Sequence, residues 1–170
     1  MFVLKILKKI IVMFQSDISP NQIAWGFALG AILGLVPNLL VKCILFVVIM
    51  FFRVNLTAAF LAATLYAIAA FALDPLLDKI GYFVLADCSF LKTLWTALFN
   101  YPIVPFSHFN NTIVMGSLVL GILLIIPNGI LAKKLLVYYR QNYRDKVSQW
   151  KIVKILNTVL ATTTIAGKIK

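Results

Sequence analysis

The residues whose types could do chemistry are few in this chain and lie far apart. Cys43 and Cys88 are isolated and His108 is the only histidine, so there is no metal-ligand spacing and no disulfide framework. The sequence also lacks a Ser/His/Asp set, a useful pair of carboxylates and a phosphate-binding loop. Asp74 and Asp78 lie at the predicted end of a helix, where an acid usually caps the helix or is solvated. We therefore predict a protein that is not an enzyme, with no catalytic residue, metal or cofactor.

Lys42 is the charged residue with the most unusual position, one turn after Pro37 in an apolar segment. Such a lysine either extends its amine to the lipid headgroups or binds an anion or a lipid headgroup in a cavity. We predict that Lys42, Arg53 and Trp150 contact headgroups or a partner.

Composition predicts a membrane protein. Of the 170 residues, 62% are hydrophobic and 12% are charged, and the mean hydropathy is +0.99. An ordinary soluble domain is about 45–50% apolar and about 25% charged. Because so short a chain cannot bury this much apolar surface within itself, lipid must cover part of it. The length suits one membrane domain.

Basic residues are unevenly distributed and indicate an orientation. Lys5, Lys8 and Lys9 lie near the N-terminus, and nine residues in 133–170 are basic against the single acid Asp145. Because these clusters flank membrane segments, the positive-inside rule explains them better than nucleic-acid binding does. We therefore predict that both termini are cytoplasmic.

A stripe of glycines marks residues 19–38. Gly26, Gly30 and Gly34 recur every four residues, after a serine and a proline that suit the start of a helix. In water, each glycine inside a helix would cost about 1 kcal/mol relative to alanine. In a membrane, the same spacing makes a smooth face that another helix backbone can approach closely. The spacing therefore predicts close helix packing.

A matching stripe of alanines lies in residues 54–73, the clearest predicted spanning helix because it has 20 residues and no charge. Ala59, Ala63 and Ala67 share one face at the same four-residue spacing. Membrane helices associate through such small residues because lipid supplies no hydrophobic driving force between them. We predict that the glycine face packs on this alanine face, or on its copy in a second subunit.

The whole pattern predicts an all-α, polytopic helical membrane protein with amphipathic interfacial helices. Three parts are predicted: an interfacial helix at 1–15, a membrane domain at 16–132, and a basic cytoplasmic helix and tail at 133–170. The membrane domain contains a hairpin at 20–52, spanning helices at 54–73 and 112–132, and a non-cytoplasmic amphipathic region at 74–111.

The glycine-rich hairpin is interrupted at Pro37 and Asn38. Its two helices are about 25 and about 22 Å long at 1.5 Å per residue, shorter than a hydrocarbon core of about 30 Å. They form either a tight hairpin of short spanning helices or a re-entrant hairpin that turns within the membrane. Both arrangements return the chain to the cytoplasmic side at Arg53. A single helix kinked at Pro37 would reverse the topology downstream and is the least favoured arrangement.

A second proline-asparagine pair, Pro127 and Asn128, is predicted to break the last spanning helix. Paired interruptions in two halves of a chain are typical of transporter sites. The residues around the two pairs align poorly, which favours coincidence over an internal repeat. The two breaks nevertheless define the alternative function, an oligomeric transporter of a small solute or ion with the broken helices lining its path.

The motif SP-x-x-IA-x-GFALG-x-x-x-GLVP, from Ser19 to Pro37, resembles the opening motif of the bacterial DUF2062 family. The segment RVNLTAAF, residues 53–60, is similar to the arginine-asparagine turn before that family's next helix. The chain departs from many members after Pro37, where Asn38 replaces a second glycine-rich turn.

The resemblance implies a small protein of the bacterial inner membrane without an established activity. A subfamily of similar length is encoded beside a large envelope protein that has one N-terminal membrane helix. This implies a membrane-embedded partner of an envelope assembly that transports or organises lipids. We therefore predict a non-enzymatic membrane subunit that packs against transmembrane helices of itself or of a larger envelope partner.

Overall fold

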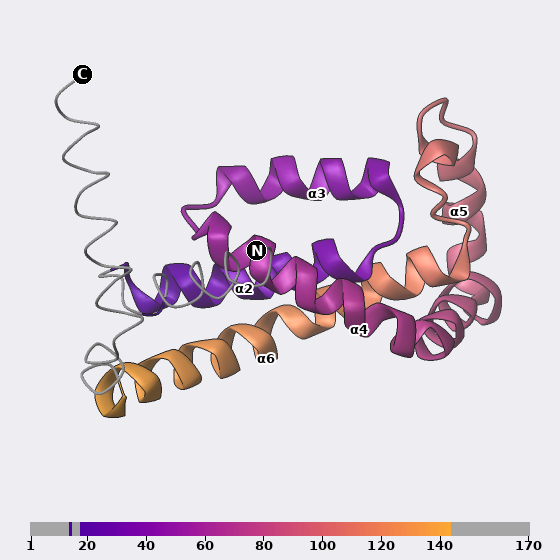
Figure 1. Cartoon of the computed structure of the whole chain (residues 1–170). Helices are drawn as coiled ribbons and strands as arrows, with labels where there is room; N and C mark the ends of the chain where they lie inside the picture. The colour runs from indigo at the N-terminus through magenta and orange to yellow at the C-terminus, as the bar shows by residue number, and fades with distance from the viewer. Residues whose placement is uncertain (1–13, 15–17, 144–170) are drawn as a thin grey trace, which may run out of the picture.

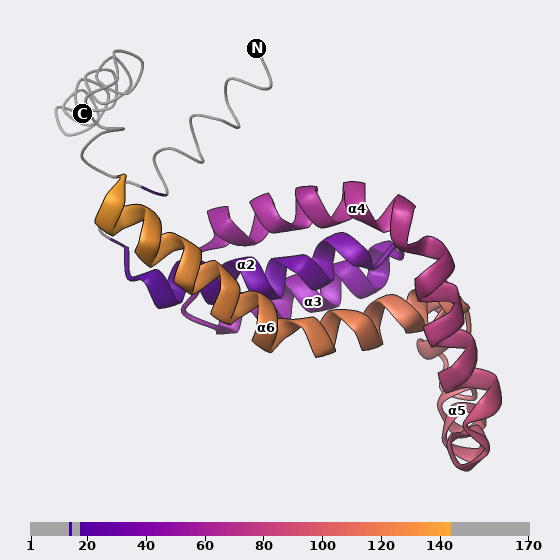
Figure 2. The same cartoon turned by 90° about the horizontal axis from the view of Figure 1, so that it is seen from below.

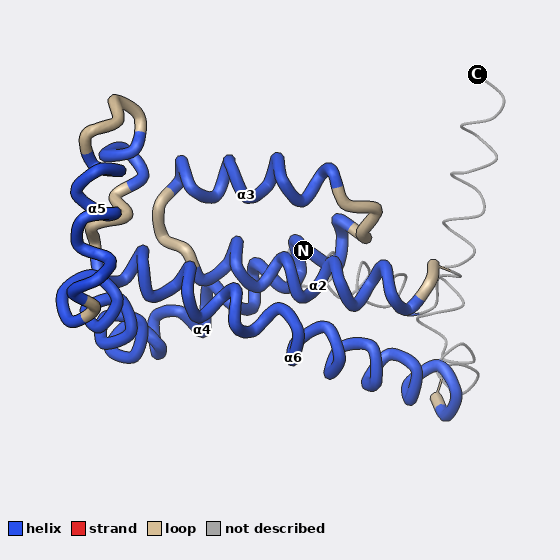
Figure 3. The backbone as a smooth tube through the Cα atoms, turned by 180° about the vertical axis from the view of Figure 1, so that it is seen from behind, coloured by secondary structure: helices blue, strands red, loops and turns tan. Residues whose placement is uncertain are grey.

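The computed structural model describes residue 14 and residues 18–143. These residues form helices joined by short loops and contain no strand (Figure 3), so the all-α prediction is confirmed. The predicted interfacial helix at 1–15, apart from Phe14, lies outside the described residues. So does the chain from residue 144 onward, including Trp150.

The core of the fold is a bundle of the helices α2 (Pro20–Leu35), α4 (Leu56–Tyr82) and α6 (Thr112–Asn142), which lie along one another (Figure 1). Helices α2 and α4 run in the same direction and α6 runs in the opposite one. Each helix starts at a polar side chain that accepts a hydrogen bond from a free backbone N–H of the first turn. The acceptors are Ser19 Oγ for Gln22 N at 3.3 Å, Asn55 Oδ1 for Ala58 N at 2.8 Å and Asn111 Oδ1 for Ile113 N at 2.9 Å.

Helix α3 (Leu39–Phe51) lies beside this bundle and runs antiparallel to α2 (Figure 1). The chain reverses over residues 36–38, where Val36 and Asn38 have extended backbones. Asn38 Oδ1 then accepts a hydrogen bond from Val41 N at 3.0 Å. This reversal excludes the single helix kinked at Pro37. Of the residues in α3, only Val41 and Ile49 are buried, so most of its surface is free of contact with the bundle.

An arm projects sideways from one end of the bundle (Figures 1 and 2). It follows the bent end of α4 and comprises η1 (Phe83–Asp87), η2 (Ser89–Leu91), α5 (Lys92–Phe99) and η3 (Val104–Ser107). Trp95 fastens it, because its indole N–H donates to Val84 O at 3.2 Å and its ring lies 6.0 Å from that of Phe109.

The two long helices extend beyond their predicted ends. Helix α4 includes Pro75 and continues to Tyr82, and α6 continues through Pro127 to Asn142 instead of breaking there. A proline inside a helix removes one backbone hydrogen bond, and membrane helices tolerate this where neighbouring helices support the chain. Figure 2 shows α4 bent towards the arm, a bend that an internal proline favours.

Within the described part of the chain, two helical stretches are long and apolar enough to cross a membrane. They are Leu56–Asp87, which combines α4 with η1, and Thr112–Asn142, which is α6. In their most apolar 18-residue windows, only 17% and 39% of the residues, respectively, are buried inside the chain. Most of this apolar surface is therefore open to whatever surrounds the protein.

Candidate functional site

The glycine stripe of α2 lies directly against α4 of the same chain. A Cβ atom added to Gly30 would lie 2.5 Å from Ala59 Cα and would also meet the Ala59 carbonyl oxygen. At Gly34 it would lie 2.7 Å from Tyr66 Cβ and 2.9 Å from Ala67 N. The two backbones are thus close enough that only glycine fits, as expected for small-residue packing of membrane helices.

One end of this crossing is also held by a hydrogen bond between two backbones. Asn55 N donates to Gln22 O at 3.0 Å, beside Gly26, whose added Cβ would lie 3.2 Å from Asn55 N. The stripe formed by Gly26, Gly30 and Gly34 is therefore covered by the start of α4 and its alanines, and no second subunit is needed to cover it. Ala59 is buried, whereas Ala63 and Ala67 are half-buried.

A second close crossing joins α4 to α6 near the arm. A Cβ atom on Gly81 would meet the backbone of Thr112, and one on Gly116 would lie 2.7 Å from Leu77 C and 3.0 Å from Gly81 N. Sequence reasoning missed this pair. Gly81 is the single glycine of α4, and Gly116 is five residues from the next glycine of α6. Neither belongs to a four-residue repeat like that of the first stripe, so no local signal predicted that they meet.

Asn128 lies in the bundle core, although the helix does not break beside it. Its side chain is 9% exposed, and its Oδ1 accepts a hydrogen bond from the Tyr66 hydroxyl at 2.8 Å. Its amide nitrogen has no partner among the described residues. The neighbouring Pro127 is exposed on the outside of α6. Asn128 therefore links α6 to α4 through a polar contact in apolar surroundings, which is costly to break.

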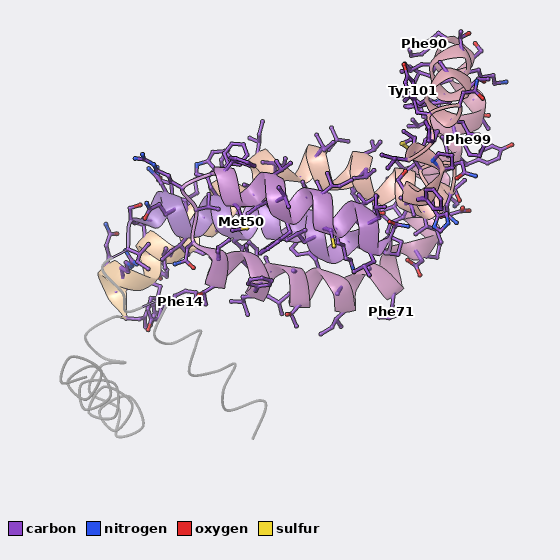
Figure 4. The ribbon with its side chains drawn as sticks, turned by 90° about the horizontal axis from the view of Figure 1, so that it is seen from above. Phe14, Met50, Phe71, Phe90, Phe99 and Tyr101 are labelled. Carbon is purple, nitrogen blue, oxygen red and sulfur yellow. The ribbon has the colours of Figure 1, made fainter. Side chains whose placement is uncertain are left out.

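A groove of about 790 Å³ runs between α3 and α4. Its walls are almost entirely apolar and come from one face of each helix, with Leu33 of α2 at its base. Besides Leu33 it is lined by Lys42, Cys43, Phe46 and Val47 of α3 and by Phe60, Ala63, Thr64, Ala67, Ile68 and Phe71 of α4. Figure 4 shows α3 in front of the bundle, with Met50 at the end away from the arm and Phe71 nearer the arm.

Lys42 is the charged residue in this groove. Among the described residues it forms no ion pair. Its level along the bundle follows from the ring contact between Phe46 and Phe60, whose centroids lie 5.6 Å apart. Lys42 precedes Phe46 by one turn in an antiparallel helix, so it lies one turn nearer the arm. Because helical side chains point towards the start of their helix, its amine is directed to the arm end of the groove.

The hairpin turn contacts the loop that leads into α6. The Asn38 side-chain amide nitrogen lies 3.0 Å from His108 Nδ1 and donates to Phe106 O at 3.4 Å. His108 has a left-handed backbone, with φ of 51°. Nearby, the Thr112 hydroxyl donates to the Asp78 carboxylate. The turn between α2 and α3 thus lies at the same end of the bundle as the start of α6 and the arm.

The two ends of the bundle differ in charge. Arg53 is exposed at the end opposite the arm, and Arg140 there donates from Nη1 to Ile18 O at 2.9 Å. Lys133 and Lys134 lie on the same half of α6. In contrast, the arm end carries the acids of the described part, Asp74, Asp78 and Asp87, together with Lys79 and Lys92.

Comparison with known proteins identifies the family of this chain. The model of a family described as "Uncharacterized protein conserved in bacteria (DUF2062)" matches residues 5–145. The chain belongs to this family. An uncharacterised protein of Treponema pallidum (strain Nichols) is 31% identical over 134 residues, which cover 78% of this chain and 82% of that protein. No solved structure matches.

The family match confirms the resemblance predicted from the motif that begins at Ser19. Of the predicted site residues, only Trp150 lies beyond the match. This DUF2062 protein therefore carries the two glycine crossings, the Asn128 contact and the groove within its family region.

Proposed function

We propose that this DUF2062 protein is a non-enzymatic, multi-pass subunit of the bacterial inner membrane. Its glycine crossings hold its own helices together, and its outer apolar faces contact lipid and a transmembrane helix of a larger envelope partner or of a second copy. The observation that carries the proposal is the low burial of the two long apolar helices, 17% and 39% in their most apolar windows. A core helix of a soluble domain would be covered by its own chain, so these faces need lipid or another helix.

The charge distribution supports an orientation with both termini in the cytoplasm. Basic residues without nearby acids gather at the end of the bundle opposite the arm, whereas at the arm end the acids of the described part accompany Lys79 and Lys92. Positive residues are retained on the cytoplasmic side of a membrane. The arm, which projects sideways from the bundle (Figure 2), would then lie along the non-cytoplasmic surface.

The position of the hairpin turn favours a short spanning hairpin over a re-entrant one. Asn38 contacts the loop at His108, just before α6 begins, so the turn reaches the same level as the start of a spanning helix. A re-entrant turn would stop near the middle of α6 instead.

The geometry gives the transporter alternative no support. Pro37 and Pro127 are both exposed and lie at opposite ends of α2. Gly129, two residues after Pro127, lies beside Trp25 in the first half of α2, whereas Pro37 follows the last residue of that helix. The described residues therefore offer the two prolines no common path.

Orientation and insertion can be tested together through Cys88, which lies in the arm, with Cys43→Ser removing the second thiol. We expect the tagged chain to stay in the membrane after alkaline carbonate extraction. Intact spheroplasts should then label Cys88 with a membrane-impermeant maleimide. A matched variant with its only cysteine at Arg53 (Arg53→Cys, Cys43→Ser, Cys88→Ser) should label only after lysis. The reverse labelling pattern, or release by carbonate, would overturn the proposal.

The partner can be sought by purification in a mild detergent followed by mass identification. A second copy or an envelope protein with a membrane helix should co-purify. Replacing the exposed Ile126 of α6 with tryptophan alters an outer face without touching the glycine crossings, whereas Gly30→Leu separates the bundle itself. A chain that remains monomeric and alone under every mild detergent would contradict the subunit role.

A further inference from the structure

We propose that the groove between α3 and α4 binds one acyl chain of an anionic phospholipid from the non-cytoplasmic leaflet, with the lipid phosphate on Lys42. The inference rests on the proposed function, because it takes the arm end of the bundle as the non-cytoplasmic side. The lipid would cover an apolar groove of about 790 Å³ that the described chain leaves open.

The length of the groove corresponds to one leaflet. Along α4 it extends from Phe60 to Phe71, 11 residues apart, which is about 16 Å at 1.5 Å per residue. A hydrocarbon core of about 30 Å has leaflets of about half that thickness. The tilted ring pair of Phe46 and Phe60 bounds the groove on the side away from the arm. Phe60 lies four residues from the start of α4, so a lipid tail that enters from the arm side would reach past the bilayer centre.

The walls of the groove suit a hydrocarbon chain. Thr64 is the hydroxyl residue among them, and its Oγ donates to Phe60 O of its own helix at 2.9 Å. The hydroxyl proton is thus already used, and the groove gains little polarity from it. Phe71, at the arm end, is 83% exposed and has no covering side chain from the described residues.

Lys42 supplies the charge complementarity. It forms no ion pair with any described residue, although it lies among apolar side chains. A cation in such surroundings is stabilised by an anion, and its amine is directed towards the arm end, where the headgroups of that leaflet would lie. The arm end also carries Lys79 and Lys92, which are exposed and outside the groove. An anionic phosphate therefore matches the one cation that lines the groove.

A transmembrane helix is a poorer occupant than a lipid tail. A helix with its side chains is about 10–12 Å wide and needs about 30 Å of length to cross the membrane. Along α4 the groove offers only about half of that length, from Phe60 to Phe71. An acyl chain is narrower and shorter than a spanning helix, so it fits the groove better.

The proposal can be tested by native mass spectrometry of the full-length protein in mild detergent, with phosphatidylglycerol or phosphatidylethanolamine added. We expect one phosphatidylglycerol per chain and weaker retention of phosphatidylethanolamine. Lys42→Ala should reduce phosphatidylglycerol affinity about tenfold, the loss expected for a hydrogen bond to a charged group. The matched control Lys79→Ala, which removes an exposed lysine near the same end, should leave the affinity unchanged.

A second pair of variants tests the position of the tail. Thr64→Trp fills the groove, whereas Leu65→Trp places the same ring on an exposed face of α4 that does not line it. Phosphatidylglycerol with a photoreactive diazirine in its acyl chain should label peptides from residues 60–71 in the Leu65→Trp protein and not in the Thr64→Trp protein.

Equal phosphatidylglycerol affinity in Lys42→Ala and Lys79→Ala would overturn the proposal. It would also be overturned if Thr64→Trp abolished a dimer or a partner complex while the bound lipid stayed unchanged, because the groove would then hold a helix. These failures leave carbonate resistance and the labelling of Cys88 intact. They are thus distinguishable from a failure of the proposed membrane subunit, in which insertion or orientation itself is lost.

Discussion

Substitution of Gly30 by alanine tests how closely α2 and α4 approach. The added Cβ would lie 2.5 Å from Ala59 Cα and closer still to the Ala59 carbonyl oxygen, whereas ordinary van der Waals contact begins at 3.4 Å. The helices must therefore separate by at least about 0.9 Å. A gap of about 0.5–1 Å already removes a quarter to a half of the dispersion energy of each contact. Overpacking usually costs about 1–3 kcal/mol, and the upper part of this range applies because the atoms that are struck are backbone and cannot rotate away.

Alanine also gains helix propensity over glycine, about 1 kcal/mol in water, which opposes the loss. We therefore expect Gly30→Ala to lower the free energy of unfolding by about 2 kcal/mol. The control is Gly129→Ala, because its Cβ would lie 3.4 Å from the Trp25 ring, an ordinary contact. This variant should be neutral or stabilised by up to about 1 kcal/mol.

The free energy of unfolding can be measured by SDS titration in mixed micelles, followed by circular dichroism. The two alanine variants should shift the midpoint of the SDS titration in opposite directions, or only Gly30→Ala should shift it. Equal stability of Gly30→Ala and the unmodified protein would refute the close approach of the two backbones.

Two further predictions concern polar contacts between distant segments. Tyr66→Phe leaves the buried Asn128 side-chain oxygen unpaired and should lower the free energy of unfolding by about 1–3 kcal/mol in the same titration. Adding Asn128→Leu should restore much of this stability, and strictly additive losses would contradict a direct hydrogen bond. Asn38→Ala removes the N-terminal cap of α3, worth about 1 kcal/mol, and also the contacts of Asn38 with Phe106 and His108. Hydrogen exchange should therefore become faster in both α3 and the loop before α6, and unchanged exchange in that loop would count against the contact.

Local chemistry predicted much of the fold. Ser19 and the proline after it predicted the start of α2, and Pro37 with Asn38 predicted the reversal into α3. The absence of charge over residues 54–73 predicted a long apolar helix. These signals are readable because capping, chain reversal and hydrophobic length depend on residues close together in sequence.

The helix ends after the internal prolines were not predictable in the same way. The predicted spanning helix ended at residue 73, before Pro75, and Pro127 was predicted to break the last one, yet both helices continue. A lost hydrogen bond is a local cost, but the benefit that outweighs it comes from other helices: Leu77 and Gly81 pack on α6, and Asn128 bonds to Tyr66.

The sequence by itself determined the class of the protein: an all-α chain, too apolar to cover itself, with a glycine stripe made for close packing and its basic residues concentrated near both termini. Only the tertiary structure decided which surfaces meet. The stripe packs within the chain on the start of α4, Gly81 and Gly116 form a second crossing, and Lys42 lines a groove between α3 and α4. The reason is physical. Periodicity specifies a helix face from neighbouring residues, whereas the partner of that face depends on how segments distant in sequence pack together.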